Sequence, residues 1–342
     1  MQCRLIPATV WAALCLAAAA GTAFGRGEPG DAGSAAESRA LAFLAREVPR
    51  WQSENHCFSC HNNGDAARAL YMARRLSRAV DPQALRETSA WLARPGEWRN
   101  NGGDPRAADH RLAAIQFASA LAAASDAGPL EAGKKTAPPD DTPLVAAGQL
   151  LVKFQRPDGS WQVDDAGQLG SPATYGTPLA TWSARQVLVK AGGLRFRESI
   201  AKADRWLSNL RPRSVLDAGV ALMYLESQGP PSADQQRMLI DLLIEWQTAR
   251  GGWGPYRGSP PQVFDTAIAL VALSGFENDA ARQAVASGRQ WLLDQQLEEG
   301  SWPETTRPAG SQSYAQRIST TAWATIALLA TAKNEKNDGP VR

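Results

Sequence analysis

Three twelve-residue segments of this 342-residue chain align without a gap, and they constrain its fold more than any other feature. They read LLVKFQRPDGSW at 150–161, LLIEWQTARGGW at 242–253 and WLLDQQLEEGSW at 291–302. Each contains an apolar pair near its start, Gln at position six, Gly at position ten and Trp at position twelve. Self-similarity of this kind is typical of a repeat architecture, in which one supersecondary unit recurs along the chain.

Weaker copies extend the pattern to six, at 43–51, 91–98 and 206–213. Each copy is followed by a second segment rich in Ala and Leu, in which apolar residues recur at helical spacing. The second segments begin near residues 66, 110, 177, 216, 265 and 319. Six helix pairs predict an all-α fold, an (α/α)6 toroid in which the second helix of each pair lines the centre and the first forms the outside.

The shared Gln, Gly and Trp predict how each pair turns. We expect the Gly to permit a tight turn, the Trp to fold back over the end of the outer helix, and the Gln to bond backbone groups that this helix end leaves open. Asp and Thr residues near the starts of the inner helices are expected N-caps. These residues are Asp65, Asp109, Thr177, Asp217, Asp265 and Thr320.

The Q-x3-G-x-W pattern resembles the QW motif of squalene–hopene cyclases and the related prenyltransferase/squalene-oxidase repeats. The resemblance covers roughly residues 36–333 and implies an α/α toroid, while leaving the function open because one fold hosts many activities. Cyclases of this kind protonate an alkene with the middle acid of an Asp-x-Asp-Asp-Thr motif. The best match is QVFDT at 262–266, where Phe264 replaces that acid. The family's cyclisation chemistry is therefore not expected, and Asp265 is the remaining catalytic candidate.

The zinc site of toroidal protein prenyltransferases is not expected either. Those enzymes hold zinc with Asp, Cys and His at the ends of inner helices. Here no Cys follows Cys60 and no His follows His110.

The first 25 residues have the features of a secretory signal peptide, with Arg4 ahead of an apolar run at 10–20 and small residues after it. The mature protein is therefore expected in the periplasm or outside the cell. No other long apolar segment follows, so the mature chain should contain no transmembrane segment. The net charge of +2 predicts no nucleic-acid surface.

The composition also predicts the domain organisation. Residues 26–36 are expected to form a flexible N-terminal segment and 37–333 a single toroid domain. A Pro-, Gly- and Lys-containing stretch at about 125–143 is expected to be a flexible insertion in that domain, and 334–342 a polar tail.

With the signal peptide removed, the only cysteines are Cys57 and Cys60, in the stretch NHCFSCH at 55–61. Together with His61 they form C-x-x-C-H, the attachment pattern of c-type haem. Two thiols at this spacing can form thioethers to one haem, and His61 then reaches the iron as the proximal ligand. Because the stretch precedes the first inner helix, we expect it at one end of the ring rather than in the packed core.

Two alternatives to haem remain. Zinc could be held by Cys57, Cys60, His61 and either His56 or His110, as a tetrahedral set. The two cysteines could also form a disulfide or redox pair, because an exported protein meets an oxidising compartment.

If haem is attached, the sixth ligand of its iron could be His110 or Met72. His110 begins the second inner helix, so in a ring of like-directed repeats it lies at the same rim as His61. Met72 follows His61 by eleven residues within a helix, which displaces it by roughly 16 Å along the axis. His110 is therefore the favoured sixth ligand.

Three functions follow from these features. The first is an exported toroid whose haem transfers electrons to a redox partner protein or senses a small ligand. The second is an enzyme that acts on an isoprenoid or other lipid in a central cavity lined by Trp182, Tyr224 and Trp323. The third is a binding module without enzymatic activity, held by a structural zinc ion or disulfide. A carbohydrate-active toroid is a further, weaker enzyme alternative.

Overall fold

The computed structural model describes residues 29–99, 101, 110–130, 143–162, 176–228, 233–305 and 313–332. Within these ranges the chain forms twelve α-helices, one π-helix and two 3-10 helices, and no strand. The all-α prediction is therefore confirmed. The expected signal peptide and polar tail lie outside the described residues, and so do residues 131–142 of the expected insertion. The first helix begins at Pro29, within the segment that the sequence predicts to be flexible.

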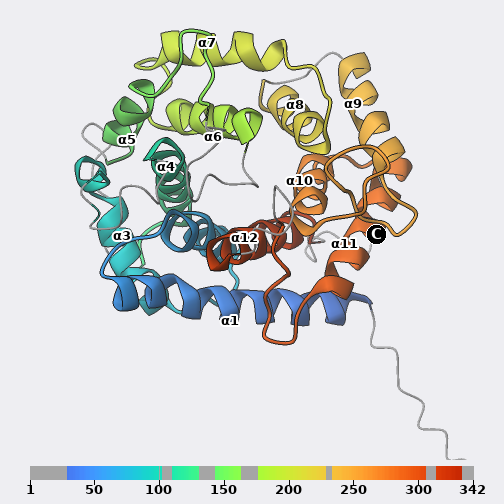
Figure 1. Cartoon of the computed structure of the whole chain (residues 1–342), viewed down its shortest axis with the longest axis horizontal. Helices are drawn as coiled ribbons and strands as arrows, with labels where there is room; N and C mark the ends of the chain where they lie inside the picture. Colours follow the sequence, from blue (N-terminus) through green and yellow to red (C-terminus); the bar gives the residue numbers. More distant parts are fainter. Residues whose placement is uncertain are drawn as a thin grey trace, which may run out of the picture.

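The helices alternate between an outer and an inner ring, as the six-pair pattern predicts (Figure 1). The outer helices are α1 (Pro29–Asn55), α3 (Arg86–Leu92), α5 (Pro143–Val152), α7 (Arg197–Ser208), α9 (Ala233–Trp246) and α11 (Asp279–Gln295). The inner helices are α2 (Ala67–Arg75), α4 (His110–Ala127), α6 (Gly176–Lys190), α8 (Val215–Ser227), α10 (Val263–Leu273) and α12 (Tyr314–Ala330). The π-helix η1 (Cys60–Ala66) leads directly into α2, and the 3-10 helices η2 (Pro82–Leu85) and η3 (Pro95–Glu97) flank α3.

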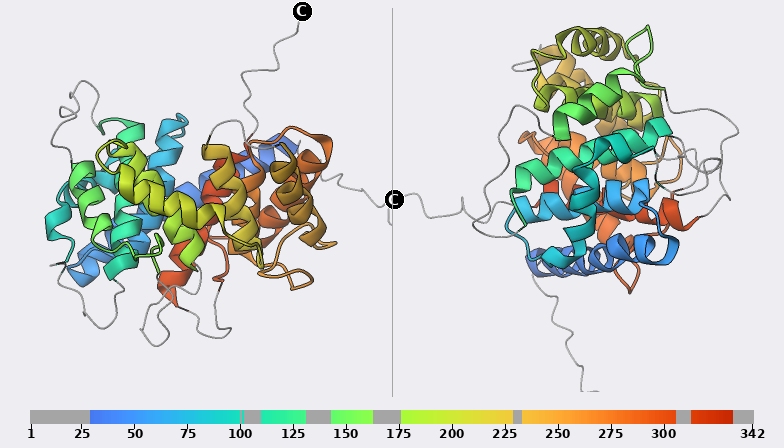
Figure 2. Two further views of the ribbon diagram at one scale, coloured as in Figure 1. Left: turned by 90° about the horizontal axis from the view of Figure 1, so that it is seen from above. Right: turned by 90° about the vertical axis from the view of Figure 1, so that its left-hand side faces the viewer.

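The inner ring closes on itself. Each inner helix packs against the next, and α12 packs against α2 (Figures 1 and 2). Small residues allow the inner helices to approach closely: a Cβ on Gly219 of α8 would lie 2.8 Å from the Cγ2 atom of Ile268 in α10. The core therefore forms one contiguous apolar layer between the two rings.

The tryptophan of each strong repeat folds back as predicted. Trp161, Trp253 and Trp302 are fully buried. Their indole N–H groups donate to carbonyls near the ends of the outer helices, those of Leu151, Leu243 and Leu292, at 2.8, 2.6 and 2.8 Å. The backbone N–H of each Trp donates to a threonine hydroxyl of the following inner helix: Thr181, Thr266 and Thr321. Each turn thus joins the two helices of a pair.

The glutamine of each strong repeat has a different partner from the one predicted. Gln247 Nε2 donates to the carbonyl of Gly251 in its own turn (2.6 Å) and to that of Ala284 in α11 (2.8 Å). Gln155 and Gln296 make the same pair of bonds, to α7 and α1 respectively. The Gln therefore does not serve the open end of its own helix; it connects one outer helix to the next.

The glycine of these turns is required by both conformation and space. Gly251 has φ +91°, and a Cβ there would lie 2.6 Å from the Ser287 carbonyl oxygen. Gly159 and Gly300 repeat this arrangement against α7 and α1. Positive φ favours glycine, and the close backbone approach excludes any side chain.

The predicted N-caps of α8, α10 and α12 are wrong. Ser214 and Ser313 cap α8 and α12 with their hydroxyls, while Gln262 precedes α10 and makes no side-chain capping bond. Asp217 and Asp265 each occupy the third helical position. There a carboxylate lies near the positive end of the helix dipole. Both helices therefore begin two residues before the acids that were expected to cap them.

None of the helices in the described ranges is both long and apolar enough to span a bilayer.

Candidate functional site

The Cys-x-x-Cys loop connects α1 to η1 and is fixed by polar and aromatic contacts. The Phe58 N–H donates to the Asn101 side-chain oxygen (2.8 Å), and the Asn101 amide donates back to the Phe58 carbonyl. The Phe58 ring stacks on Trp91 with centroids 4.6 Å apart. Cys57 and Cys60 are half-buried, and neither forms a disulfide. The loop therefore holds its two sulfurs near the surface on an ordered backbone.

The chain enters the core immediately after Cys60, through the π-helix. Ser59 caps η1 by accepting from the His61 N–H (3.1 Å), and Asn63 Oδ1 accepts from the Ser59 N–H (2.9 Å). Gly64 packs against Gln116 of α4, where a Cβ would lie 2.8 Å from the Gln116 Cβ. π-Helical turns are rare in proteins, and those that occur are often found at functional sites.

His61 is buried, with only 7% of its surface exposed. Burial lowers the pKa of His61 to about 4, so the imidazole is neutral at physiological pH. Its Nδ1 atom is buried without a hydrogen-bond partner. The prediction that the motif lies at one end of the ring and outside the core is therefore wrong for its C-terminal half, because η1 turns that half inward.

Two asparagines after His61 connect the motif to three helices. Asn62 Nδ2 donates to the Glu47 carbonyl of α1 (2.8 Å) and to the Tyr314 hydroxyl of α12 (2.9 Å). Asn63 Nδ2 donates to the Val48 carbonyl (3.2 Å) and to the Thr88 hydroxyl (2.9 Å). Both asparagines are fully buried, and these bonds offset the desolvation of their NH2 groups, whereas Asn62 Oδ1 is buried without a partner.

Asp65 was expected to cap the first inner helix, but it lies inside η1 and is 2% exposed. Its Oδ2 accepts from Gln116 Nε2 of α4 (2.6 Å) and from the Ser319 hydroxyl of α12. Burial raises the pKa of Asp65 to about 6, although these two donors and the nearby Arg68 favour the ionised form. Asn62, Asn63 and Asp65 together form a buried polar cluster in η1. The sequence offered one signal for this polar cluster, the run HNNGD directly ahead of an apolar inner helix.

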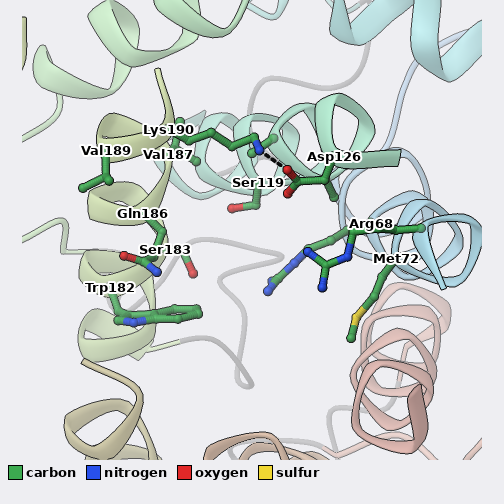
Figure 3. A pocket seen from close by; sticks show the side chains of 13 residues that line it. Arg68, Met72, Ser119, Asp126, Trp182, Ser183, Gln186, Val187, Val189 and Lys190 are labelled. Atoms are coloured by element: carbon green, nitrogen blue, oxygen red, sulfur yellow. Dashed lines mark hydrogen bonds and ion pairs between the residues drawn. The ribbon is translucent and has the colours of Figure 1, made fainter. Parts of the chain in front are cut away.

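A cavity of about 450 Å³ lies inside the ring between α2, α4 and α6. Arg68, Met72 and Arg75 of α2 line one side, and Trp182 and Lys190 of α6 line the other. Figure 3 shows Arg68 and Trp182 extending toward the middle of the cavity from opposite walls. Of the aromatic residues expected to line a cavity, only Trp182 does so.

The other two predicted cavity aromatics belong to the core. Trp323 is fully buried and packs edge-on against Phe264, with centroids 5.9 Å apart. Tyr224 is 6% exposed and donates from its hydroxyl to the Asp204 carbonyl (3.3 Å). Asp265 is fully buried in the first turn of α10 and is not among the cavity-lining residues.

The predicted metal ligands lie in different parts of the molecule. His110 is the first residue of α4 and is exposed, whereas Met72 lines the cavity. The described ranges contain no group of three or more His, Cys, Asp or Glu side chains that could hold a metal ion. The tetrahedral zinc set is therefore not assembled here.

Comparisons with known proteins agree with the ring architecture. Residues 214–340 match the squalene-hopene cyclase C-terminal domain family. A copalyl diphosphate synthase of Streptomyces cyslabdanicus is 31% identical over 103 residues, which are 29% of this chain and 19% of that enzyme. The chain thus matches about a fifth of the length of this curated relative.

Solved structures extend the similarity over most of the chain. A single-residue variant of the type II terpene cyclase MstE from Scytonema was solved in complex with its substrate geranylgeranyl dihydroxybenzoate. Its structure matches this chain with a TM-score of 0.54 and 17% identity, and the match covers 88% of this chain and 98% of MstE. A Salmonella enterica protein described as a possible member of the GH105 family matches with a TM-score of 0.56 and 12% identity, and the match covers 89% of this chain and 94% of that protein. The chain therefore has the α/α toroid fold of the squalene–hopene and type II terpene cyclases.

Proposed function

We propose that this protein is an exported haem protein, with one c-type haem attached to Cys57 and Cys60 and ligated by His61. The single observation that carries the proposal is the state of His61: a neutral, buried imidazole with an unpartnered nitrogen, one residue after a half-buried thiol that forms no disulfide. Iron ligation requires a neutral imidazole, and a buried polar atom without a partner requires an explanation.

The residues present fit the group in the chemistry of their donors. Cys57 and Cys60 would form the thioethers and His61 would supply the proximal nitrogen, with exposed His110 as the proposed sixth ligand. Bound haem would supply one-electron transfer to a redox partner, or reversible binding of a small ligand at iron. The protein's own contribution is rigidity, because Asn62 and Asn63 tie the segment after His61 to α1, α3 and α12.

The test is an absorption spectrum of the full chain, exported from a host with a cytochrome c maturation system and recorded oxidised and reduced. We expect a Soret band and sharp reduced α and β bands, with haem retained on a denaturing gel. The double variant Cys57→Ala/Cys60→Ala should lose covalent haem and keep the helical far-UV spectrum. A colourless wild-type protein, or haem retained by the double variant, would contradict the proposal.

A second candidate function is favoured by the central cavity together with the comparisons. The terpene cyclase MstE was solved with geranylgeranyl dihydroxybenzoate as its substrate, and another MstE structure contains merosterolic acid A as its product. We propose that an isoprenoid or other lipid occupies the cavity beside Trp182, without the cyclase's alkene protonation, because Phe264 replaces the acid. Mass spectrometry of lipids that co-purify with the exported chain tests this; no enrichment over an unrelated exported protein would count against it.

A further inference from the structure

The central cavity contains more positive charge than its own side chains neutralise. Arg68 and Arg75 are seven residues apart on α2 and therefore lie on one helix face. Across the cavity, Lys190 of α6 forms an ion pair with Asp126 of α4 (Figure 3). Asp126 is thus already occupied, and no described acid forms an ion pair with either arginine. Asp65 acts on Arg68 only through its field, because its Oδ2 bonds Gln116 and Ser319.

Arg68 is held in a geometry suited to binding an anion. Its guanidinium lies over the Trp323 ring, 4.8 Å from the centroid. This cation–π contact holds the guanidinium in place but gives its N–H groups no oxygen or nitrogen acceptor. One of these nitrogens, Nη1, is buried without a hydrogen-bond partner. Such a donor is costly unless a ligand satisfies it.

The remaining walls are mostly apolar or weakly polar. Met72, Ala122, Ala123, Trp182 and Val187 line the cavity beside the charged groups. A volume of about 450 Å³ is in the range of small-molecule sites. The site therefore offers a cationic region beside an apolar wall within one open pocket.

We propose that this cavity binds an amphiphilic anion, whose carboxylate or phosphate group is held by Arg68 and Arg75 while its apolar part lies against Trp182 and Met72. Planar guanidinium groups bind carboxylate and phosphate oxygens in pairs. The proposal is independent of haem attachment, and it rests on the second candidate function only in placing the ligand in the same cavity.

The experiment measures binding of four probes to the full-length exported protein by isothermal titration calorimetry. The probes are farnesyl diphosphate, farnesoic acid, farnesol and inorganic pyrophosphate. We expect the diphosphate and the acid to bind at least about tenfold more tightly than farnesol, because only they satisfy the guanidinium. Binding of pyrophosphate as tight as that of farnesyl diphosphate would overturn the apolar half of the proposal.

Variants separate the subsite from general lipid binding. Arg68→Ala and Arg75→Ala should each weaken binding of the anionic probes about tenfold and leave farnesol unchanged. Arg68→Lys, which keeps the charge over Trp323, should recover only part of the loss. Arg282→Ala on the exposed face of α11 is the matched control, and circular dichroism establishes that each variant is folded.

Two results would overturn the anion subsite. One is equal affinity for farnesol and farnesoic acid, which would leave the lipid function standing without a charged head group. The other is wild-type binding of the anionic probes by both Arg68→Ala and Arg75→Ala. Absence of binding by all four probes would overturn the lipid function as well, while the haem spectrum would remain a separate result.

Discussion

The turn after the first outer helix differs from the three turns that end in a buried tryptophan. In those three turns, here called the clamp turns (150–161, 242–253 and 291–302), the same Gln, Gly and Trp contact backbone atoms at equivalent places. In the first repeat the turn is replaced by the Cys-x-x-Cys loop and η1, where buried polar side chains reach α1, α3, α4 and α12.

The clamp turns show which contacts recur around the ring, and the first turn shows which contacts are particular to one repeat. The Gln and Trp side chains of the clamp turns bond to backbone carbonyls, and the one side-chain partner, a threonine hydroxyl, recurs in all three turns. The same contacts can therefore be repeated around the ring. The cluster in η1 depends on particular partners such as Thr88 and Gln116. The match to the cyclase C-terminal domain family covers residues 214–340, which include two clamp turns and exclude η1.

The largest expected effect is on a clamp turn. Trp302→Ala should lower the free energy of unfolding by about 4 kcal/mol, because it truncates a fully buried aromatic and removes its bond to the Leu292 carbonyl. Urea denaturation measures this. Trp206→Ala, at a half-buried position in α7, should cost clearly less. Equal losses would remove the distinction between clamp tryptophans and other tryptophans.

The glycine of a clamp turn should be the next most sensitive position. Gly251→Ala should cost about 3 kcal/mol, because a Cβ would combine strained φ with a 2.6 Å approach to the Ser287 carbonyl. Gly258→Ala is the matched control, since it has φ +76° but nothing within 4 Å of its Cβ position. That control should cost about 1 kcal/mol. The difference in melting midpoint between the two variants isolates the effect of close packing.

The polar cluster should respond to pH where the clamp turns do not. The pKa of Asp65 is about 6 in the folded protein and 3.8 when unperturbed, so the folded state holds a proton more tightly between these values. Stability relative to Asp65→Asn should therefore be greatest near pH 4 and fall by up to ~3 kcal/mol as pH rises to 7.

Urea denaturation of the wild type and Asp65→Asn at pH 4, 5, 6 and 7 measures this dependence. Asp279→Asn, at an exposed position of α11, is the control and should follow the wild type. A constant difference between the wild type and Asp65→Asn across this range would show that Asp65 is not perturbed by burial.

The smallest expected effect is on the connection between outer helices. Gln247→Ala removes two bonds, to the Gly251 and Ala284 carbonyls, and should cost about 1 to 2 kcal/mol. Gln290→Ala, at an exposed position of α11, should change the free energy of unfolding by less than about 0.5 kcal/mol. A neutral Gln247→Ala would mean that helix packing alone connects neighbouring outer helices.

The sequence by itself determined the architecture of this protein. Helical periodicity and the recurring Gly and Trp of the clamp turns act over a few residues, so they can be recognised without knowing any distant contact. This local information was sufficient for the number of helix pairs, their inner and outer placement and the fold of each Trp. It also located the Cys-x-x-Cys-His stretch, because that pattern is recognised by its spacing alone.

Only the tertiary structure decided what surrounds that stretch. The partners of Asp65 are 51 and 254 residues away in the chain, and Arg68 meets Trp323 across the joint between the first and last repeats. Closure of the ring brings these residues together, and burial then sets the pKa values of His61 and Asp65. The glutamine partners on the next outer helix and the cationic cavity arise in the same way, because their geometry exists only once distant helices have packed.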